Sequence, residues 1–269
     1  MTPIVWGYTF LEAPRSDGDG LYFSDIIAGG VYRWSPDATV DTIIPKRRGV
    51  GGLIPHADGG LVVSGRDVCH VRDGTSRTLL TVEGAVGFND LTTDARGRVY
   101  VGSMRSGAME LEGRVPSELW RIDVEGRKVE ICGGIEFPNG VGFAPDGRTL
   151  YLSNYSEGIV LAVDPASGER RTFVRVPKGH PDGLAVDEAG GVWVALGDGG
   201  GVARFMPDGA LGRTLDVPAH FVASLCFGGV DHRDLFVVTA DNTDDPGRGA
   251  TVFRTRADVP GLTLPRAVV

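Results

Sequence analysis

Turn glycines recur along this chain about every 40 to 50 residues, and that interval constrains the fold more than any other feature. Each follows a run in which apolar and small residues alternate, and each precedes a second apolar run. This is the pattern of a strand, a tight turn and a second strand. No segment keeps a helical apolar period over about ten positions, so helices are expected to be minor. The repeated glycines are Gly20, Gly59, Gly97, Gly147 and Gly190.

Six such segments divide the chain, the last one running through residues 224–238. Several short strands per repeat, without helical crossovers, favour an all-β antiparallel toroid. The sequence therefore predicts that residues 1–269 form a single domain, a six-bladed β-propeller. Ile4-Val5-Trp6 is expected to add a strand to the last blade and close the ring. The longest loop-like segment, residues 104–116, is expected to lie over one mouth of the channel.

A polar residue stands eight positions before four of the turn glycines. The chain contains only four asparagines, yet two of them, Asn89 and Asn139, occupy this position. Glu12 and Asp182 occupy it in two other repeats, and Gly51 leaves space in a fifth. Because the first strand of every propeller blade lines the central channel, one register position should form a ring of side chains at one level.

This ring offers two carboxylates and two carboxamides. Such oxygen donors suit a hard divalent cation, Ca²⁺ first, with Mg²⁺ and Mn²⁺ as alternatives. Without a cation, Glu12 and Asp182 would be two like charges in a confined site. Each residue taken singly could instead cap local backbone, as Asn and Asp often do. Their shared register favours the metal site.

The formal net charge of −8 argues against nucleic acid or an anionic membrane as a partner, because both require a basic face. The one basic cluster, Lys46-Arg47-Arg48, is read as a solvated loop. Neither a membrane-length apolar run nor a secretory signal is visible. The three separated cysteines form no disulfide framework, which suits a cytoplasmic protein. The oligomeric state stays open.

Several short motifs together resemble the senescence marker protein/gluconolactonase/luciferin-regenerating enzyme family of regucalcin-like proteins. The motifs are Glu12-Ala13-Pro14, Phe88-Asn89-Asp90, Asn139-Gly140, Pro181-Asp182-Gly183-Leu184 and Cys226-Phe227-Gly228-Gly229. The resemblance implies a six-bladed propeller with one divalent cation in its channel, commonly a lactone hydrolase, and Zn²⁺ joins the candidate metals. It also implies that Glu12, Asn139 and Asp182 bind the metal, whereas Asn89 contacts the substrate.

The chain departs from this family at Gly87, where members that act on sugar lactones often carry arginine. Without that cation, a polyhydroxylated substrate loses a hydrogen-bonding partner. Apolar candidates for the site wall are Trp6, Met104, Tyr155 and Phe221. A lactone or ester less polar than gluconolactone is therefore the expected small-molecule substrate, although these side chains could equally be ordinary blade packing.

Two histidines, His180 and His220, are expected near the mouth of the channel. His180 lies two residues before Asp182, and residues at that spacing share one face of a strand. Each histidine is either a polar loop residue or a proton shuttle. No Gly-x-Ser-x-Gly motif and no recognisable Cys-His pairing support a covalent nucleophile.

These observations favour a metal-dependent lactonase, a hydrolase in which the cation polarises the substrate carbonyl. Asp182 and Asn89 are the expected catalytic residues. Asp182 would accept a proton from the attacking water, and Asn89 would hydrogen-bond the substrate. Two alternatives remain open. The same site could serve an isomerase, a lyase or a phosphoester hydrolase, or the chain could be a non-catalytic Ca²⁺-binding propeller.

Overall fold

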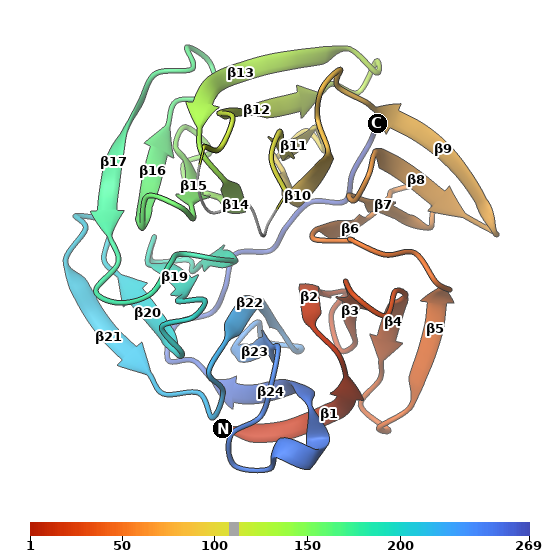
Figure 1. Ribbon diagram of the computed structural model, residues 1–269, viewed down its shortest axis with the longest axis vertical. Helices are drawn as coiled ribbons and strands as arrows, with labels where there is room; N and C mark the ends of the chain where they lie inside the picture. The colour runs from red at the N-terminus through yellow and green to blue at the C-terminus, as the bar shows by residue number, and fades with distance from the viewer. Residues whose placement is uncertain (108–112) are drawn as a thin grey trace.

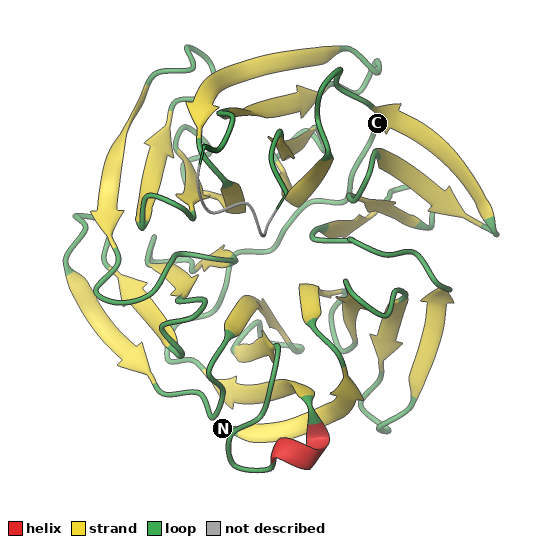
Figure 2. Cartoon of the chain, in the orientation of Figure 1, coloured by secondary structure: helices red, strands yellow, loops and turns green. Residues whose placement is uncertain are grey.

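The computed structural model describes residues 1–107 and 113–269 as a ring of six four-stranded antiparallel sheets (Figure 1). The prediction of a six-bladed β-propeller is confirmed. In five blades the strands pair in chain order from the channel outwards. The only helical element in the described residues is a 3-10 turn, η1 (Pro246–Arg248), drawn in red in Figure 2. None of the helical structure described has the length and apolar character needed to cross a bilayer.

The first three blades take up the N-terminal half of the chain. Blade 1 contains β2 (Leu11–Ser16), β3 (Leu21–Asp25), β4 (Val31–Trp34) and β5 (Val40–Ile44). Blade 2 contains β6 (Leu53–Pro55), β7 (Leu61–Val63), β8 (Val68–Arg72) and β9 (Thr75–Leu80). Blade 3 contains β10 (Gly87–Thr93), β11 (Val99–Met104), β12 (Ser117–Ile122) and β13 (Lys128–Ile135).

The other three blades complete the ring. Blade 4 contains β14 (Pro138–Phe143), β15 (Leu150–Asn154), β16 (Ile159–Val163) and β17 (Arg170–Arg175). Blade 5 contains β18 (Leu184–Val186), β19 (Val192–Ala195), β20 (Val202–Phe205) and β21 (Leu211–Leu215). Blade 6 contains β22 (Val222–Gly228), β23 (Asp234–Thr239), β24 (Ala250–Arg256) and, outermost, β1 (Thr2–Tyr8).

The predicted glycine turns connect the first two strands of a blade. In blade 4 the Gly147 amide donates to the Ala144 carbonyl at 2.9 Å, and the Ala144 amide donates to the Thr149 carbonyl at 2.9 Å. Gly147 has φ +65°, in the left-handed region that glycine adopts at little cost. This turn therefore requires glycine at position 147, and the spacing of the glycines is the feature that predicts the turn.

Six hydrophobic clusters fill the six spaces between neighbouring blades. Strand β19 shows why its sequence is apolar at every position. Val192 and Val194 pack towards blade 4, whereas Trp193 and Ala195 pack towards blade 6. Because successive strand residues point to opposite faces and both faces are buried, the whole strand is apolar.

The N-terminal strand closes the ring, as predicted. β1 pairs with β24, with Thr2 opposite Arg254 and Tyr8 opposite Ala250. The expectation that Trp6 lines the channel is wrong. Trp6 lies on this outermost strand, is 49% exposed, and has the Arg248 guanidinium 4.3 Å from the centre of its ring.

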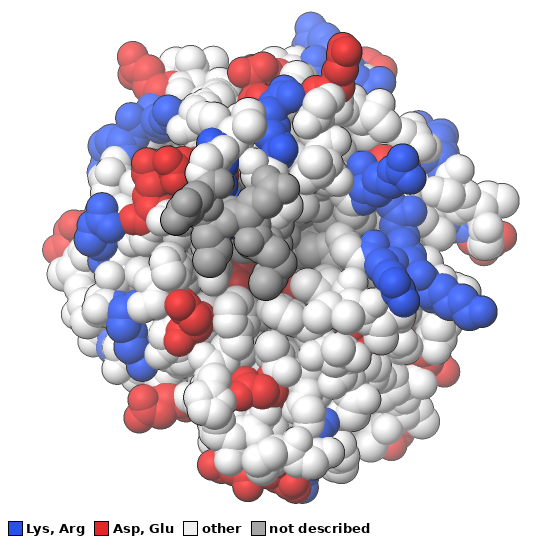
Figure 3. Space-filling view, in the orientation of Figure 1, with Lys and Arg blue, Asp and Glu red and all other residues white. Residues whose placement is uncertain are grey.

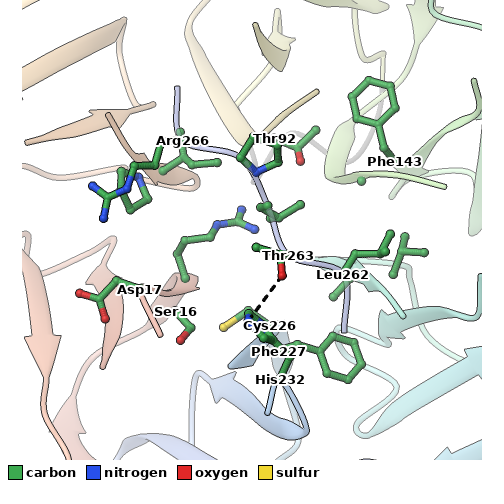
Figure 4. A pocket seen from close by; sticks show the side chains of 18 of the residues that line it. Ser16, Asp17, Thr92, Phe143, Cys226, Phe227, His232, Leu262, Thr263 and Arg266 are labelled. Atoms are coloured by element: carbon green, nitrogen blue, oxygen red, sulfur yellow. Dashed lines mark hydrogen bonds between the residues drawn. The ribbon is translucent and has the colours of Figure 1, made fainter. Parts of the chain in front are cut away.

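Residues 260–269, called the strap below, cross the end of the channel at which the glycine turns lie (Figure 1). The strap amides of Leu262, Ala267 and Val268 donate to carbonyls of blades 5, 2 and 3, at 3.0, 2.9 and 2.8 Å. Between the strap and the inner strands lies a cavity of about 250 Å³ (Figure 4). The strap therefore closes this end, and the opposite end is the mouth.

Ala267 and its neighbour Val268 allow a matched test of the strap. Ala267 is fully buried in the cluster between blades 2 and 3, whereas Val268 is 45% exposed. We expect Ala267→Asp to lower the free energy of unfolding by about 3 kcal/mol or more, because it buries a charge without a partner. Val268→Asp should cost less than about 1 kcal/mol. Urea denaturation measures both, and equal losses would show that the strap is not packed as described.

Candidate metal centre and active site

One-residue bulges interrupt the innermost strands at the level where the ring of polar side chains is predicted. In β2 the pairing with β3 advances by an extra residue between Glu12 and Arg15. The same irregularity lies in β10 between Phe88 and Leu91, and in β14 between Pro138 and Val141. A bulge bends the strand and changes the direction of its side chains. Glu12, Asn89 and Asn139 all lie within or at the edge of such a bulge.

Asp182 lies just before β18 and is held by backbone bonds to three blades. Its amide donates to the Ala195 carbonyl at 2.9 Å, and the next amide, of Gly183, donates to the Ala223 carbonyl of blade 6 at 2.9 Å. Its carbonyl accepts the Gly140 amide of blade 4 at 3.1 Å. A Cβ at Gly140 would lie 2.5 Å from that carbonyl oxygen, so only glycine permits this approach.

Glu12 and Asp182 are both buried, with 6% and 3% of their surface exposed. Burial raises the pKa of Glu12 well above its usual range, and the charges of Asp182 and Asp90 raise it further. Burial likewise raises the pKa of Asp182, with a further contribution from Asp90. Without a cation, the folded chain therefore holds these carboxyl groups at a cost.

Asn139 is the third member of the predicted ligand set and lies next to Asp182. It is buried, and its side chain hydrogen-bonds the Asp182 carboxylate, an interaction that opposes the rise in pKa. Asp182 Oδ1 is nevertheless buried without a hydrogen-bond partner among residues 1–107 and 113–269. Buried carboxylate oxygens are almost always satisfied, so this one has a place for a cation or a donor that these residues do not supply.

The three predicted ligands fit a hard divalent cation. Glu12 and Asp182 supply negative charge, Asn139 supplies a neutral oxygen, and Asp182 Oδ1 has no competing donor. No cluster of three or more His, Cys, Asp or Glu side chains placed to hold a metal occurs in residues 1–107 and 113–269. The amide oxygen of Asn139 is therefore needed to complete a set of three.

Asp90 is a third buried carboxylate, which the analysis of the sequence left without a role. Burial raises its pKa to about 6, while Arg15 and the backbone amides of Leu91 and Val141 oppose the rise. Arg15 Nη2 lies 3.9 Å from Asp90 Oδ1. The Arg15 guanidinium also donates to the Leu53 and Leu91 carbonyls, both at 3.1 Å. Arg15 thus links blades 1, 2 and 3 beneath the ring and supplies a permanent positive charge.

Asn89 lies between blades 2 and 4. Its Nδ2 is 3.4 Å from the Pro138 carbonyl, and its Oδ1 would be 2.2 Å from a Cβ at Gly51. Gly51 thus leaves the space that Asn89 occupies, as the common register predicts. Asn89 is half-buried, so part of its amide remains accessible to a ligand.

Gly87 pairs with Met104 across β10 and β11. A Cβ at Gly87 would lie 3.1 Å from Met104 Cε and 3.1 Å from the Gly65 carbonyl oxygen. The thioether end of Met104 and the Gly65 carbonyl therefore both lie beside Gly87, and a contact between this position and a substrate stays a prediction. Residues 108–112 of the predicted mouth loop lie outside the described residues.

Tyr155 and His180 form a stacked pair beside Asp182. Their ring centres are 4.9 Å apart, and His180 Nδ1 lies 2.8 Å from Asp198 Oδ1. Burial, Asp182 and Asp198 raise the pKa of Tyr155, so its hydroxyl stays protonated. His180 and Asp182 do not share a strand face as predicted, because β18 begins only at Leu184.

The other two residues predicted near the mouth lie on blade 6. Phe221 packs edge-on against Phe10, with ring centres 5.2 Å apart, in the cluster between blades 6 and 1. His220 has a largely exposed side chain and pairs with Asp241 at 2.7 Å. A contact between Phe221 and a substrate stays a prediction.

Comparison with known proteins shows that the chain is similar to proteins named as lactonases. The chain matches the SMP-30/Gluconolactonase/LRE-like region over residues 10–241. It is 34% identical over 245 residues to pentonolactonase XacC of Haloferax volcanii, covering 87% of this chain and 81% of that one. It is 32% identical over 266 residues to 6-deoxy-6-sulfogluconolactonase of Pseudomonas putida, covering 91% and 89%. A solved luciferin-regenerating enzyme shares the fold, with a TM-score of 0.88, 23% identity, and coverage of 99% and 97%.

The variants Asp182→Asn and Asn89→Ala should distinguish a metal ligand, Asp182, from a residue that only borders the metal site, Asn89. Calcium at about a hundred times its Kd stabilises a folded protein by about 2.7 kcal/mol. We expect Asp182→Asn to lose that stabilisation and, with chelator present, to be at least as stable as wild type, because a buried like charge is gone. Asn89→Ala should retain the calcium effect. Thermal unfolding with calcium and with chelator is the measurement, and equal loss of the calcium effect would make Asn89 a ligand.

Proposed function

Because the chain belongs to the SMP-30/Gluconolactonase/LRE-like family, we propose that it is a lactonase that hydrolyses a cyclic ester at the mouth of its channel with the aid of a divalent cation. The observation that carries the proposal is the unpartnered Asp182 Oδ1 beside a second buried carboxylate. Two relatives named as lactonases align with more than four fifths of this chain, which supports the reaction class.

Glu12, Asn139 and Asp182 are the side chains that would hold the cation. Ca²⁺ is the first candidate for this oxygen-donor set, followed by Mg²⁺, Mn²⁺ and Zn²⁺. When bound, the cation supplies Lewis-acid polarisation of the lactone carbonyl. The polypeptide's own contribution is to bury Glu12, Asn139 and Asp182, and to fix the backbone beside Asn139 and at Asp182 through the bond from the Gly140 amide to the Asp182 carbonyl.

Asp182 is the proposed general base. Its hydrogen bond to Asn139 orients the carboxylate. One carboxylate oxygen would hold the cation, and a water beside the other oxygen can transfer a proton to it while the water oxygen attacks the carbonyl carbon. Burial and the neighbouring Asp90 raise the pKa of Asp182, and a bound cation would counter both and keep the carboxylate ionised, as a proton acceptor must be.

Asn89, Met104, Tyr155 and His180 would form the walls around the lactone, and Phe221 is the remaining wall candidate. The Asn89 amide can donate to or accept from the substrate. The protonated Tyr155 hydroxyl offers a donor close to the carboxylates. Met104 and Gly87 present an apolar surface. This arrangement supports a substrate with fewer hydroxyls than gluconolactone on the side that faces Gly87.

Proton release from a panel of lactones tests the reaction class. We expect wild type with calcium to open at least one lactone in a pH-stat assay, and chelator to reduce kcat/KM by about a hundredfold or more, since one metal typically contributes several kcal/mol. Asp182→Asn should be inactive with metal present. Turnover that chelator does not change would contradict the metal dependence. Calcium binding without any turnover would instead indicate a non-catalytic propeller.

Gly87→Arg tests the apolar wall, with Gly87→Ala as the control for the added Cβ. Charge-assisted hydrogen bonds contribute about 1.5–3 kcal/mol, or roughly ten- to a hundredfold in binding. We expect wild type to prefer alkyl-substituted lactones to gluconolactone in kcat/KM. Gly87→Arg should shift the preference towards gluconolactone, because Met104 Cε can move aside for the new side chain. A wild type that prefers gluconolactone, with no gain in Gly87→Arg, would show that Gly87 does not select the substrate.

A further inference from the structure

Three exposed cations, Lys46, Arg48 and Arg66, lie on loops that open at the mouth of the channel. Lys46 and Arg48 belong to the connection between β5 and β6, and Arg66 belongs to the connection between β7 and β8. In an antiparallel blade both connections emerge at the end where the innermost strands begin, which is the end that carries Glu12 and Asn89. Figure 3 shows Lys and Arg side chains gathered on this face beside the recess at its centre. These three residues are called the basic rim below.

The backbone that carries the basic rim touches the site directly. The Gly65 carbonyl accepts the Phe88 amide at 2.7 Å and borders Gly87, and Arg66 is the next residue in the chain. On the other loop Gly51 contacts Asn89, and Arg48 precedes it by three residues. Arginine side chains at these positions are long enough to reach a group that projects from a substrate held at Asn89.

The basic rim has no role in the internal ion pairing of the fold. Arg47, in the middle of the same loop, pairs with Asp67 at 2.6 Å. Lys46, Arg48 and Arg66 make no salt bridge with a carboxylate in the described parts of the chain, although acidic residues exceed basic ones by 35 to 27. The loop backbone is nevertheless fixed, because the Gly30 and Gly49 amides bind the Arg47 and Ile26 carbonyls at 2.9 and 3.0 Å.

We propose that the basic rim recognises an anionic group on the substrate, so that the lactone carries a carboxylate, phosphate or sulfonate at the end remote from its ring. This inference rests on the proposed lactonase function. The channel interior holds the buried carboxyl groups of Glu12, Asp90 and Asp182, which are poor partners for an anion, whereas the exposed rim attracts one. The substrate is thereby oriented, with its ring at the ligand set and its charge outside. The basic rim lies on blade 2 and the loop before it. It supplies the positive charge that an arginine at position 87 would have supplied.

The test compares three lactones that share one alkyl chain, which ends in a methyl group, a carboxylate or a phosphate. Wild type should have the higher kcat/KM for the anionic lactones. The triple variant Lys46→Gln/Arg48→Gln/Arg66→Gln should lower kcat/KM for an anionic lactone about tenfold relative to its neutral counterpart, mostly through KM. Salt at about 1 M should remove the preference of wild type, because it screens exposed charges within about 3 Å.

The matched control is Arg96→Gln/Lys128→Gln/Arg148→Gln, which removes the same charge from exposed positions at the turn end of the ring. This control variant should keep the wild-type ratio of kcat/KM for the anionic lactone to kcat/KM for the neutral lactone. An unchanged ratio in the rim variant, or an equal loss on neutral and anionic lactones, overturns the proposal while the lactonase function stands. Failure of wild type to open any lactone overturns the proposed function and this inference with it. A higher kcat/KM for the carboxylate lactone than for the phosphate lactone, or the reverse, identifies which anion the basic rim prefers.

Discussion

The site depends on three carboxyl groups, those of Glu12, Asp90 and Asp182, that the fold holds together in one buried channel. Burial raises the pKa of all three, Asp90 and Asp182 raise that of Glu12 further, and Asp90 raises that of Asp182. Opposing these effects, within residues 1–107 and 113–269, are the Arg15 guanidinium, the Asn139 side chain and a few backbone amides. That compensation is incomplete at Asp182 Oδ1, which has no donor among the described residues. A site that leaves a carboxylate oxygen unsatisfied in this way is organised for a positive group that arrives from outside.

The propeller tolerates these buried carboxyl groups because the stability of the fold comes from other parts of the structure. Six apolar clusters between blades hold the ring, and none of them includes the site carboxylates. Bulges in the innermost strands redirect a few residues towards the channel. An inter-blade bond from the Gly140 amide to the Asp182 carbonyl fixes the backbone at Asp182 and beside Asn139.

The fold and the ring of polar residues could be predicted because both follow from spacing. Gly147 and its counterparts mark the turns, and Glu12, Asn89, Asn139 and Asp182 share one register. The roles of Arg15 and Asp90 could not be predicted, since they depend on a contact between blades. Trp6 is close to Glu12 in sequence, yet its strand completes blade 6 on the outside. The strap has neither turn glycines nor a clear period, so only its hydrogen bonds to the blades reveal it.

The two ends of the channel differ in charge and in access, and this difference gives the site its direction. At the turn end the strap closes the ring, and Arg15 binds the Leu53 and Leu91 carbonyls beneath the carboxylates. At the mouth the carboxylates lie inside and the exposed cations Lys46, Arg48 and Arg66 lie outside. For a neutral ring with an anionic tail, the tail would be attracted by the rim and disfavoured beside the buried carboxyl groups, so one orientation is preferred. The field of the protein can therefore orient such a substrate before any close contact forms, since charge acts over a longer range than packing.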